Sequence, residues 1–229
     1  RSIVMKLSNE TLTVLKNFAN INPGIEFKTG KKLTTISATK TVLAKAGIKD
    51  DFPQDFCIYD LNQFLSVQSL YKDGEIDFDN EHVIFKVGRK KLNYRKTAKS
   101  MIVTPPDKDL NLPSVDVSFT LKEEELASVL KTASILQSPN IAITSDGEKI
   151  YITTCDAKDN SAHTDSTEIA DGNGKKFKAL FLTENFKMIA GTYEVQISSK
   201  GLSYFRNSKE DMQYWIAIEA KESDLTFGE

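Results

Sequence analysis

Two distant segments of this chain share a three-residue motif and the same helical spacing of apolar residues. Val14-Leu15-Lys16 occurs again as Val129-Leu130-Lys131, 115 residues further along the chain. Around both copies, apolar residues recur every three or four positions, which is the pattern of a helix with one buried face. Repetition of this unit favours two similar domains over one large domain.

The two predicted helices have different start signals. The first begins after Ser8, a common N-cap residue, and the second begins at Thr120, which has capping-box spacing with Glu123. Lys16 and Lys131 fall on the polar faces of these helices. The predicted inward positions are Leu12, Leu15, Phe18 and Ala19 in the first helix and Leu126, Val129, Leu130 and Ala133 in the second.

A proline-rich segment divides the chain near its middle. Three prolines and several charges between Thr104 and Pro113 oppose regular helix or strand hydrogen bonding. We therefore expect an N-terminal domain over 1–104, a linker over 105–117 and a C-terminal domain over 118–229.

Each half also carries a second, weaker helix signal. Asp60 caps the first of these segments and Thr183 the second, with Lys187 on the polar face and Gly191 as the stop. The expected fold is α+β, built twice, with two helices on one face of an antiparallel sheet in each domain. Strands are predicted at 140–144, 149–154, 192–198, 202–206 and 213–219.

The composition is that of a globular protein, with 40 % hydrophobic and 27 % charged residues. No apolar run approaches the about 18 residues of a membrane span, so we expect no membrane partner. The formal charge of −2 means that any contact with nucleic acid must depend on a local basic patch. Cys57 and Cys155 lie far apart in strand-like sequence, which is typical of reduced thiols in a cytosolic protein.

Catalytic motifs are missing from the sequence. His82 and His163 belong to no recognisable nucleophile or metal arrangement, and no glycine-rich phosphate loop is present. We therefore expect no enzyme activity, no catalytic residue, no metal and no cofactor. The acidic residues Asp156, Asp159, Asp165 and Asp171 lack the order of a calcium loop, which favours a solvated loop.

Residues 86–99 form the most basic stretch of the chain. One interpretation is a phosphate-binding strip with aromatic platforms for single-stranded DNA, and the favoured one is an exposed edge hairpin protected by lysines. A third hypothesis for the whole chain is a β-rich virion or scaffold protein. The basic side chains are Lys86, Arg89, Lys90, Lys91, Arg95, Lys96 and Lys99, with Phe85 and Tyr94 among them.

One strand near the C-terminus is a candidate for partner binding. Residues 214–218 contain the only Trp, Trp215, which suits either a completed sheet or the rim of a groove. Leu110, Leu112 and Pro113 of the linker are candidates for the opposite wall.

Several segments together resemble the sliding clamps of T-even-type bacteriophages. They are Met5 to Ser8, Leu15 to Ala19 with Ile21, Asn22, Gly24 and Ile25, Ile58 to Asn62 with Phe64 and Leu65, Ile141 to Thr144, and Lys187 and Met188 with Gly191 and Tyr193. Arg1 to Val4 precede the usual start of that family and are treated as an extension.

The resemblance implies two tandem processivity-fold domains, similar to those of the proliferating cell nuclear antigen, and a homotrimeric ring around duplex DNA. It implies contacts with double-stranded DNA, a polymerase C-terminal peptide and an ATP-driven clamp loader, in the cytoplasm of an infected bacterial host. The DNA-facing residues are then Lys6, Lys16, Lys131 and Lys187. The peptide groove is then Leu110, Leu112, Pro113, Trp215 and Ala217.

Overall fold

The chain divides into two units in the computed structural model, unit 1 (Arg1–Asp107) and unit 2 (Lys108–Glu229). Residues 4–228 are described, so most of the proposed extension, residues 1–3, lies outside the described residues. Three α-helices occur in the described range, two in unit 1 and one in unit 2.

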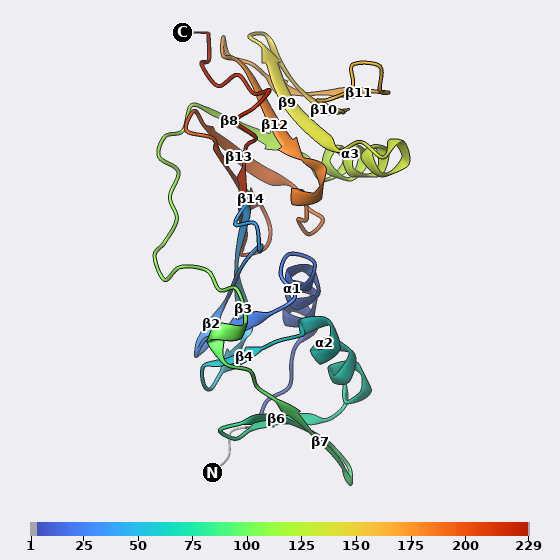
Figure 1. The fold of residues 1–229 in the computed structure, drawn as a ribbon, viewed down its shortest axis with the longest axis vertical. Coiled ribbons are helices and arrows are strands. Elements are labelled where there is room, and N and C mark those ends of the chain that lie inside the picture. Colours follow the sequence, from blue (N-terminus) through green and yellow to red (C-terminus); the bar gives the residue numbers. More distant parts are fainter. Residues whose placement is uncertain (1–3, 229) are drawn as a thin grey trace. The chain divides into compact units, whose positions relative to one another are not determined.

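Unit 1 combines two helices with short antiparallel strands. β1 pairs with β4, β2 pairs with β3, and β5, β6 and β7 form a three-stranded sheet in that order. α1 and α2 lie next to each other on one side of the strands (Figure 1). The elements are α1 (Asn9–Ala19), β1 (Ile25–Phe27), β2 (Gly30–Ile36), β3 (Val42–Phe52), β4 (Phe56–Ile58), α2 (Leu61–Leu70), β5 (Glu75–Phe78), β6 (His82–Val87), β7 (Lys90–Arg95) and the 3₁₀ turn η1 (Lys99–Met101).

Both helices of unit 1 begin at the predicted caps. The Ser8 hydroxyl accepts a hydrogen bond from the Thr11 N–H (3.2 Å), and the Asp60 carboxylate accepts one from the Gln63 N–H (3.0 Å). Each bond satisfies a backbone donor that has no partner within its helix. The core between helices and strands is aromatic, with ring centroids 4.6–5.9 Å apart around Phe27 and Phe64; its rings are Phe27, Phe52, Phe56, Phe64 and Phe85.

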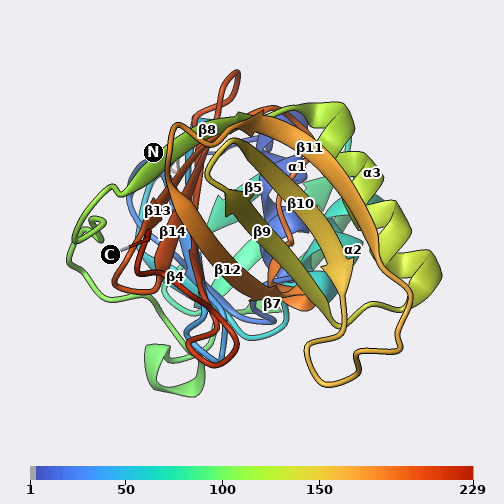
Figure 2. The ribbon, with the colours of Figure 1, turned by 90° about the horizontal axis from the view of Figure 1, so that it is seen from above.

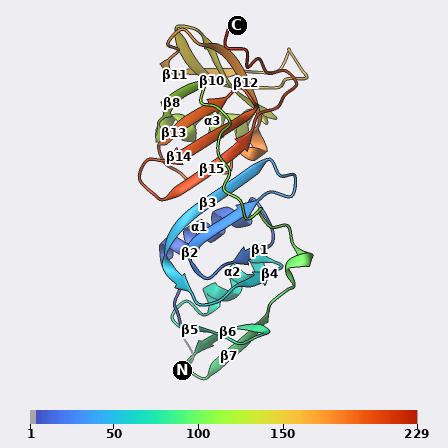
Figure 3. The same cartoon turned by 90° about the vertical axis from the view of Figure 1, so that its left-hand side faces the viewer.

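Unit 2 consists of two four-stranded antiparallel arrays and one helix. One array has the order β8-β13-β14-β15, and the other has the order β12-β9-β10-β11. α3 packs beside β10 and β11 (Figure 2), and β13, β14 and β15 lie side by side (Figure 3). The elements are β8 (Val117–Leu121), α3 (Glu123–Leu136), β9 (Asn140–Asp146), β10 (Lys149–Cys155), β11 (Asp165–Asp171), β12 (Lys176–Leu182), η2 (Thr183–Asn185), β13 (Tyr193–Ser198), β14 (Leu202–Asn207) and β15 (Met212–Ala217).

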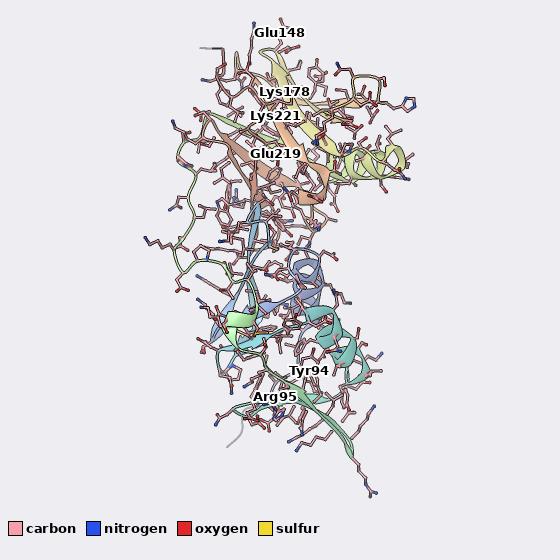
Figure 4. The ribbon with its side chains drawn as sticks, in the orientation of Figure 1. Tyr94, Arg95, Glu148, Lys178, Glu219 and Lys221 are labelled. Atoms are coloured by element: carbon pink, nitrogen blue, oxygen red, sulfur yellow. The ribbon has the colours of Figure 1, made fainter. Side chains whose placement is uncertain are left out.

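The C-terminal segment covers the outer side of β12. Lys178 and Asp224 exchange two backbone hydrogen bonds of 2.8 Å, and the Glu219 N–H donates to the Leu180 carbonyl (2.8 Å). Lys178 and Glu219 are labelled in Figure 4. This protects an edge that would otherwise offer unpaired backbone groups. In the described part of the chain, β7 is an end strand of its sheet within unit 1, and β11 is an end strand of its sheet within unit 2.

Two sequence expectations about helices are wrong. α3 begins after Lys122 and not at Thr120, because Glu125 accepts the Lys122 N–H (3.1 Å) while the Thr120 hydroxyl donates to Glu194 (3.0 Å) from strand β8. The second helix predicted for the C-terminal half is a single 3₁₀ turn, η2. Thr183 does not cap a helix there, since its hydroxyl donates to the Ser138 carbonyl (2.8 Å).

Candidate nucleic-acid and partner-binding surfaces

Lys6 is exposed on a segment of unit 1 that is held at both ends. Before it, Met5 forms a two-bond antiparallel bridge with Ile76 of β5 (2.9 and 2.8 Å). After it, the N–H and hydroxyl of Ser8 both donate to Asp50 Oδ2 (2.9 and 2.8 Å). The same contacts therefore fix the backbone around Lys6 and the start of α1.

The helix surface of unit 1 carries little charge apart from Lys16. Lys16 is exposed in the last turn of α1, where a cation interacts favourably with the helix dipole. The carboxylate of Glu10 on the same helix is 2.9 Å from Lys49 of β3, which offsets its charge. α2 has no charged residue, and its exposed polar positions are Asn62, Gln63, Ser66 and Ser69.

Unit 2 carries the other two predicted lysines. Lys131 is exposed on α3, two turns beyond the acidic first turn Glu123–Glu125, which is itself favourable at a helix N-terminus. Lys187 is exposed as well, but it follows η2 in a segment without helix or strand. Its neighbours Phe186 and Met188 are buried. The expectation that a helix displays Lys187 is therefore wrong, although the side chain does reach the surface.

The basic stretch at residues 86–99 covers the end of β6, all of β7 and the start of η1, and five of its seven cations have partners within unit 1. Three of these partners are carboxylates, which reduce the positive charge available to a polyanion. The contacts are Lys86 with Asp77 (3.5 Å), Lys90 over the Tyr71 ring (4.9 Å), Arg95 with Glu81 (3.9 Å), Lys96 with Gln54 (2.6 Å) and Lys99 with Glu26 (3.3 Å).

The aromatic residues of this hairpin are also engaged. Phe85 is fully buried, and the Tyr94 and Phe64 rings are nearly perpendicular, with centroids 5.5 Å apart. The Tyr94 hydroxyl donates to Gln63 Oε1 (2.8 Å), and burial raises the pKa of Tyr94. Base stacking needs an exposed ring face, which Phe85 lacks, and Tyr94 is half-buried with its hydroxyl engaged. These features favour the edge-hairpin interpretation over a single-stranded DNA strip. Tyr94 and Arg95 are labelled in Figure 4.

Three of the five predicted groove residues line one cavity in unit 2. Leu110, Leu112 and Trp215 border a cavity of about 350 Å³. Pro113 and Ala217 do not line it. The sequence did not identify the rest of the lining, which is Asn111, Val115, Gln196, Tyr204 and Gln213.

The floor of this cavity is a row of side chains across three strands. Gln196 of β13 lies opposite Tyr204 of β14, and Tyr204 lies opposite Trp215 of β15. The ring centroids of Tyr204 and Trp215 are 5.0 Å apart. Gln213 precedes Trp215 by two residues and therefore faces the same side of β15. All of the lining residues are uncharged, a surface that suits an apolar or amide-bearing ligand.

The segment that forms the other wall is anchored beside the cavity. The Ser114 hydroxyl and the Ser199 N–H donate to Asp116 Oδ2 (2.6 and 2.7 Å), and the Ser114 and Ser198 hydroxyls are 2.8 Å apart. These donors hold the pKa of Asp116 below its ordinary value. The bonds fix residues 114–116 against the β13–β14 turn.

Neither a metal centre nor a membrane-spanning helix is found in the described range. Residues 4–228 contain no group of three or more His, Cys, Asp or Glu side chains arranged to hold a metal ion. No helix among them is long and apolar enough to cross a membrane.

The two units repeat one connectivity. In unit 2, β8 joins the β13-β14-β15 array, and in unit 1 the Met5 bridge attaches the corresponding segment to β5-β6-β7. Residues 7–104 match a family described as DNA polymerase processivity factor, and residues 118–220 match the C-terminal domain of the gp45 sliding clamp. The fold is therefore that of a processivity factor with two tandem clamp domains.

Curated relatives identify the family more closely. The sliding clamp of Vibrio phage KVP40 is 32 % identical over 94 % of this chain and its own full length. The sliding clamps of Escherichia phage RB69 and Enterobacteria phage T4 are each 33 % identical, over 94 % of this chain and 97 % of their own lengths. The chain belongs to this family of phage sliding clamps.

Solved structures share the fold at low sequence identity. A. fulgidus PCNA, bound to the C-terminal region of FEN-1, has a TM-score of 0.67 at 14 % identity, covering 96 % of this chain and 98 % of its own. The H. pylori beta clamp has a TM-score of 0.70 at 12 % identity, covering 95 % of this chain and 66 % of its own.

Proposed function

We propose that this protein is a DNA sliding clamp that encircles duplex DNA and tethers the replicative polymerase for processive synthesis. The observation that carries the proposal is the repeated clamp-domain topology, together with full-length similarity to phage sliding clamps. Such a clamp performs no catalysis itself. Its ring holds DNA by enclosure, so the polymerase stays on the template without a tight contact to any base.

The proposed DNA-facing residues are Lys6, Lys16, Lys131 and Lys187. All four are exposed, and the cationic side chains can offset phosphate repulsion without reading sequence. Because the polar face of α2 is uncharged, few cations per protomer would touch the duplex, which suits sliding more than tight binding.

A charge-reversal experiment tests this surface. In the Lys16→Glu, Lys131→Glu double variant, we expect clamp-dependent primer extension to stop at lower salt than in the parent, since two attractive phosphate contacts become repulsive. Lys200→Glu, at an exposed turn, is the matched control and should behave as the parent does. Unchanged extension and unchanged salt sensitivity in the double variant would rule out this lysine surface.

We further propose that three copies close the ring through the two sheet edges identified above. β7 carries Lys90, Lys91 and Arg95, whereas β11 carries Asp165, Glu168 and Asp171. Edge strands of opposite charge can extend one sheet from copy to copy, and such head-to-tail contacts generate closed rings. Lys149 lies 2.7 Å from Asp171 and 3.4 Å from Glu168, and Arg95 lies 3.9 Å from Glu81, so both edges are partly neutralised before assembly.

Mass measurement in solution tests the ring. Lys91→Glu with Arg95→Glu places like charges on both edges, so we expect the trimer to dissociate at lower salt. Adding Asp165→Lys and Glu168→Lys to that chain restores opposite charges at every junction and should recover the trimer. A trimer unaffected by the first pair, or not recovered by the second, contradicts edge pairing.

The uncharged cavity of unit 2 is the proposed site for a polymerase C-terminal peptide. Leu110, Leu112 and the Tyr204–Trp215 pair offer an apolar surface, while Gln196 offers amide hydrogen bonds. Leu112→Ser should weaken binding of that peptide, and Pro113→Ser, next to it but outside the lining, should not. Equal affinities of the two variants would remove the cavity from this role.

The remaining parts of the proposal concern the loader and the location. An ATP-driven clamp loader opens the ring so that DNA can enter. The protein then acts in the cytoplasm of an infected bacterial host.

A further inference from the structure

One lysine of the proposed DNA-facing set, Lys187, is displayed without a helix. Phe186 and Met188 on either side of it are 5 % and 8 % exposed, so alternate side chains point into unit 2 and toward solvent. The backbone of this segment belongs to no sheet in the described structure. Its orientation must therefore come from other contacts.

Two buried tyrosines supply such contacts at Ile189. The Tyr193 hydroxyl donates to the Ile189 carbonyl (2.7 Å), and the Ile189 N–H donates to the Tyr214 hydroxyl (3.0 Å). Both polar groups of one residue are thus fixed by side chains of β13 and β15. These two groups belong to the successive peptide units on either side of the Ile189 Cα atom, so both peptide planes are held against rotation.

The environment of the two rings keeps their hydroxyls in place. Both side chains are fully buried, with ring centroids 6.0 Å apart, and Tyr193 also contacts Phe205. Burial raises the pKa of Tyr193 to about 12, and it raises the pKa of Tyr214 as well. Both hydroxyls therefore keep their protons at neutral pH.

The end of the segment is fixed as well. Gly191 packs so closely on the side-chain amide of Asn207 that an added Cβ would collide with it. Asn207 also accepts the N–H groups of Lys209 and Glu210 (2.9 Å each), which ties this amide to the β14–β15 turn. Residues 186–191 are therefore held by buried side chains, by two hydroxyls and by a close backbone approach.

We propose that Tyr193 and Tyr214 are positioning residues for Lys187, holding its backbone so that the ammonium group is presented to the phosphates of duplex DNA. The proposal rests on the proposed clamp function and deepens it. The tyrosines do not touch DNA. They fix the backbone near Lys187, as helical hydrogen bonds fix the backbone at Lys16 and Lys131.

A double-mutant cycle separates positioning from general stability. The variants are Tyr193→Phe, Tyr214→Phe and Lys187→Gln, alone and combined, with the retention of loaded rings on nicked circular DNA measured against salt. Phenylalanine keeps the buried ring and removes only the hydroxyl. Tyr151→Phe, a half-buried tyrosine of β10, is the matched control.

Each tyrosine variant should reproduce the effect of Lys187→Gln, and should add nothing once Lys187 is already replaced. In a plot of the logarithm of retention against the logarithm of salt concentration, the slope should become shallower by about one for each phosphate contact that is lost. A parental slope in both tyrosine variants overturns the inference. So does an equal effect of Tyr→Phe in the presence and absence of Lys187.

The results also separate a failure of this inference from a failure of the proposed clamp function. If Lys16→Glu with Lys131→Glu impairs synthesis while Lys187→Gln changes nothing, the clamp function stands and the positioning role is refuted. If neither has any effect, the DNA-facing surface itself is wrong and the inference fails with it.

Discussion

The two units differ at one matching point of their topology, which follows β4 in unit 1 and β12 in unit 2. In unit 1 the element at this point is α2, a ten-residue helix capped by Asp60. In unit 2 it is the three-residue turn η2, followed by the segment that the tyrosines hold. A repeated fold can therefore keep its connectivity while one copy exchanges backbone hydrogen bonds for side-chain ones.

Hydrogen-bond partners, and not the spacing of buried residues, distinguish the two elements. The buried residues of both are compatible with a helix face, since in unit 2 Asn185 is buried three positions before Met188. In unit 2, however, the Ile189 N–H donates to the Tyr214 hydroxyl, and the Ile189 carbonyl accepts from the Tyr193 hydroxyl. These side chains bind backbone groups that a helix would pair internally.

The largest effect is expected from removing the inward anchor of α2. Phe64 is 1 % exposed and packs against the rings of Phe27, Phe85 and Tyr94. Phe64→Ala should lower the free energy of unfolding by about 3–5 kcal/mol, because the ring packing disappears and a cavity remains. Urea denaturation followed by circular dichroism measures this, with exposed Asn62→Ala as the control. Similar losses of stability in the two variants would mean that α2 is not held by its buried face.

Alkaline pH should affect the tyrosine-held segment next. Because the pKa of Tyr193 is raised from 10.0 to about 12, the native state keeps this proton more tightly than the unfolded state. Its contribution is complete below pH 10 and is lost as the pH rises through 12, by about 3 kcal/mol at most. Denaturation curves between pH 9 and 12, compared with those of Tyr193→Phe, measure it. An identical pH dependence in the two proteins would contradict the assigned cause.

An exchange of the two predicted cap residues, of which only Asp60 caps a helix, should then have unequal effects. Asp60→Thr keeps an acceptor for the Gln63 N–H and should cost a few tenths of a kcal/mol. Thr183→Asp introduces a better N-cap residue, yet it should cost about 1–2 kcal/mol, since a carboxylate cannot donate to the Ser138 carbonyl. Thermal unfolding of both variants provides the comparison. Stabilisation by Thr183→Asp would show that the segment can become a helix after all.

The smallest effect is expected from glycine substitutions at exposed sites. Ser66→Gly in the middle of α2 should cost about 0.5 kcal/mol, because glycine loses more backbone entropy in a helix. Glu184→Gly, in the single turn η2, should cost less than that. The two unfolding free energies, measured side by side, test whether helix propensity matters more in α2 than in η2.

Much of the fold could be predicted because local signals and burial agree. Ser8 and Asp60 are caps in both sequence and structure, and the predicted strands of the C-terminal half correspond to β9, β10, β13, β14 and β15. At Thr183 and Thr120 the cap residue is present but its hydroxyl has another partner. No local pattern reveals that competing partner, because it comes from elsewhere in the chain.

The cavity illustrates the same limit. Trp215, Leu110 and Leu112 stand out as apolar residues in a strand and a linker, and Gln213 follows from alternation along β15. Tyr204 and Gln196 could not be found in this way, because their place beside Trp215 depends on the register of three strands.

Enclosure of DNA is tested most directly by cutting the DNA. Fluorescently labelled protein is loaded onto a nicked circular plasmid with its loader and ATP, the excess is removed, and one restriction site is cleaved. A ring that holds DNA by enclosure should stay on the circle and leave through the new ends after cleavage. Retention on the linear product equal to that on the circle would contradict the account.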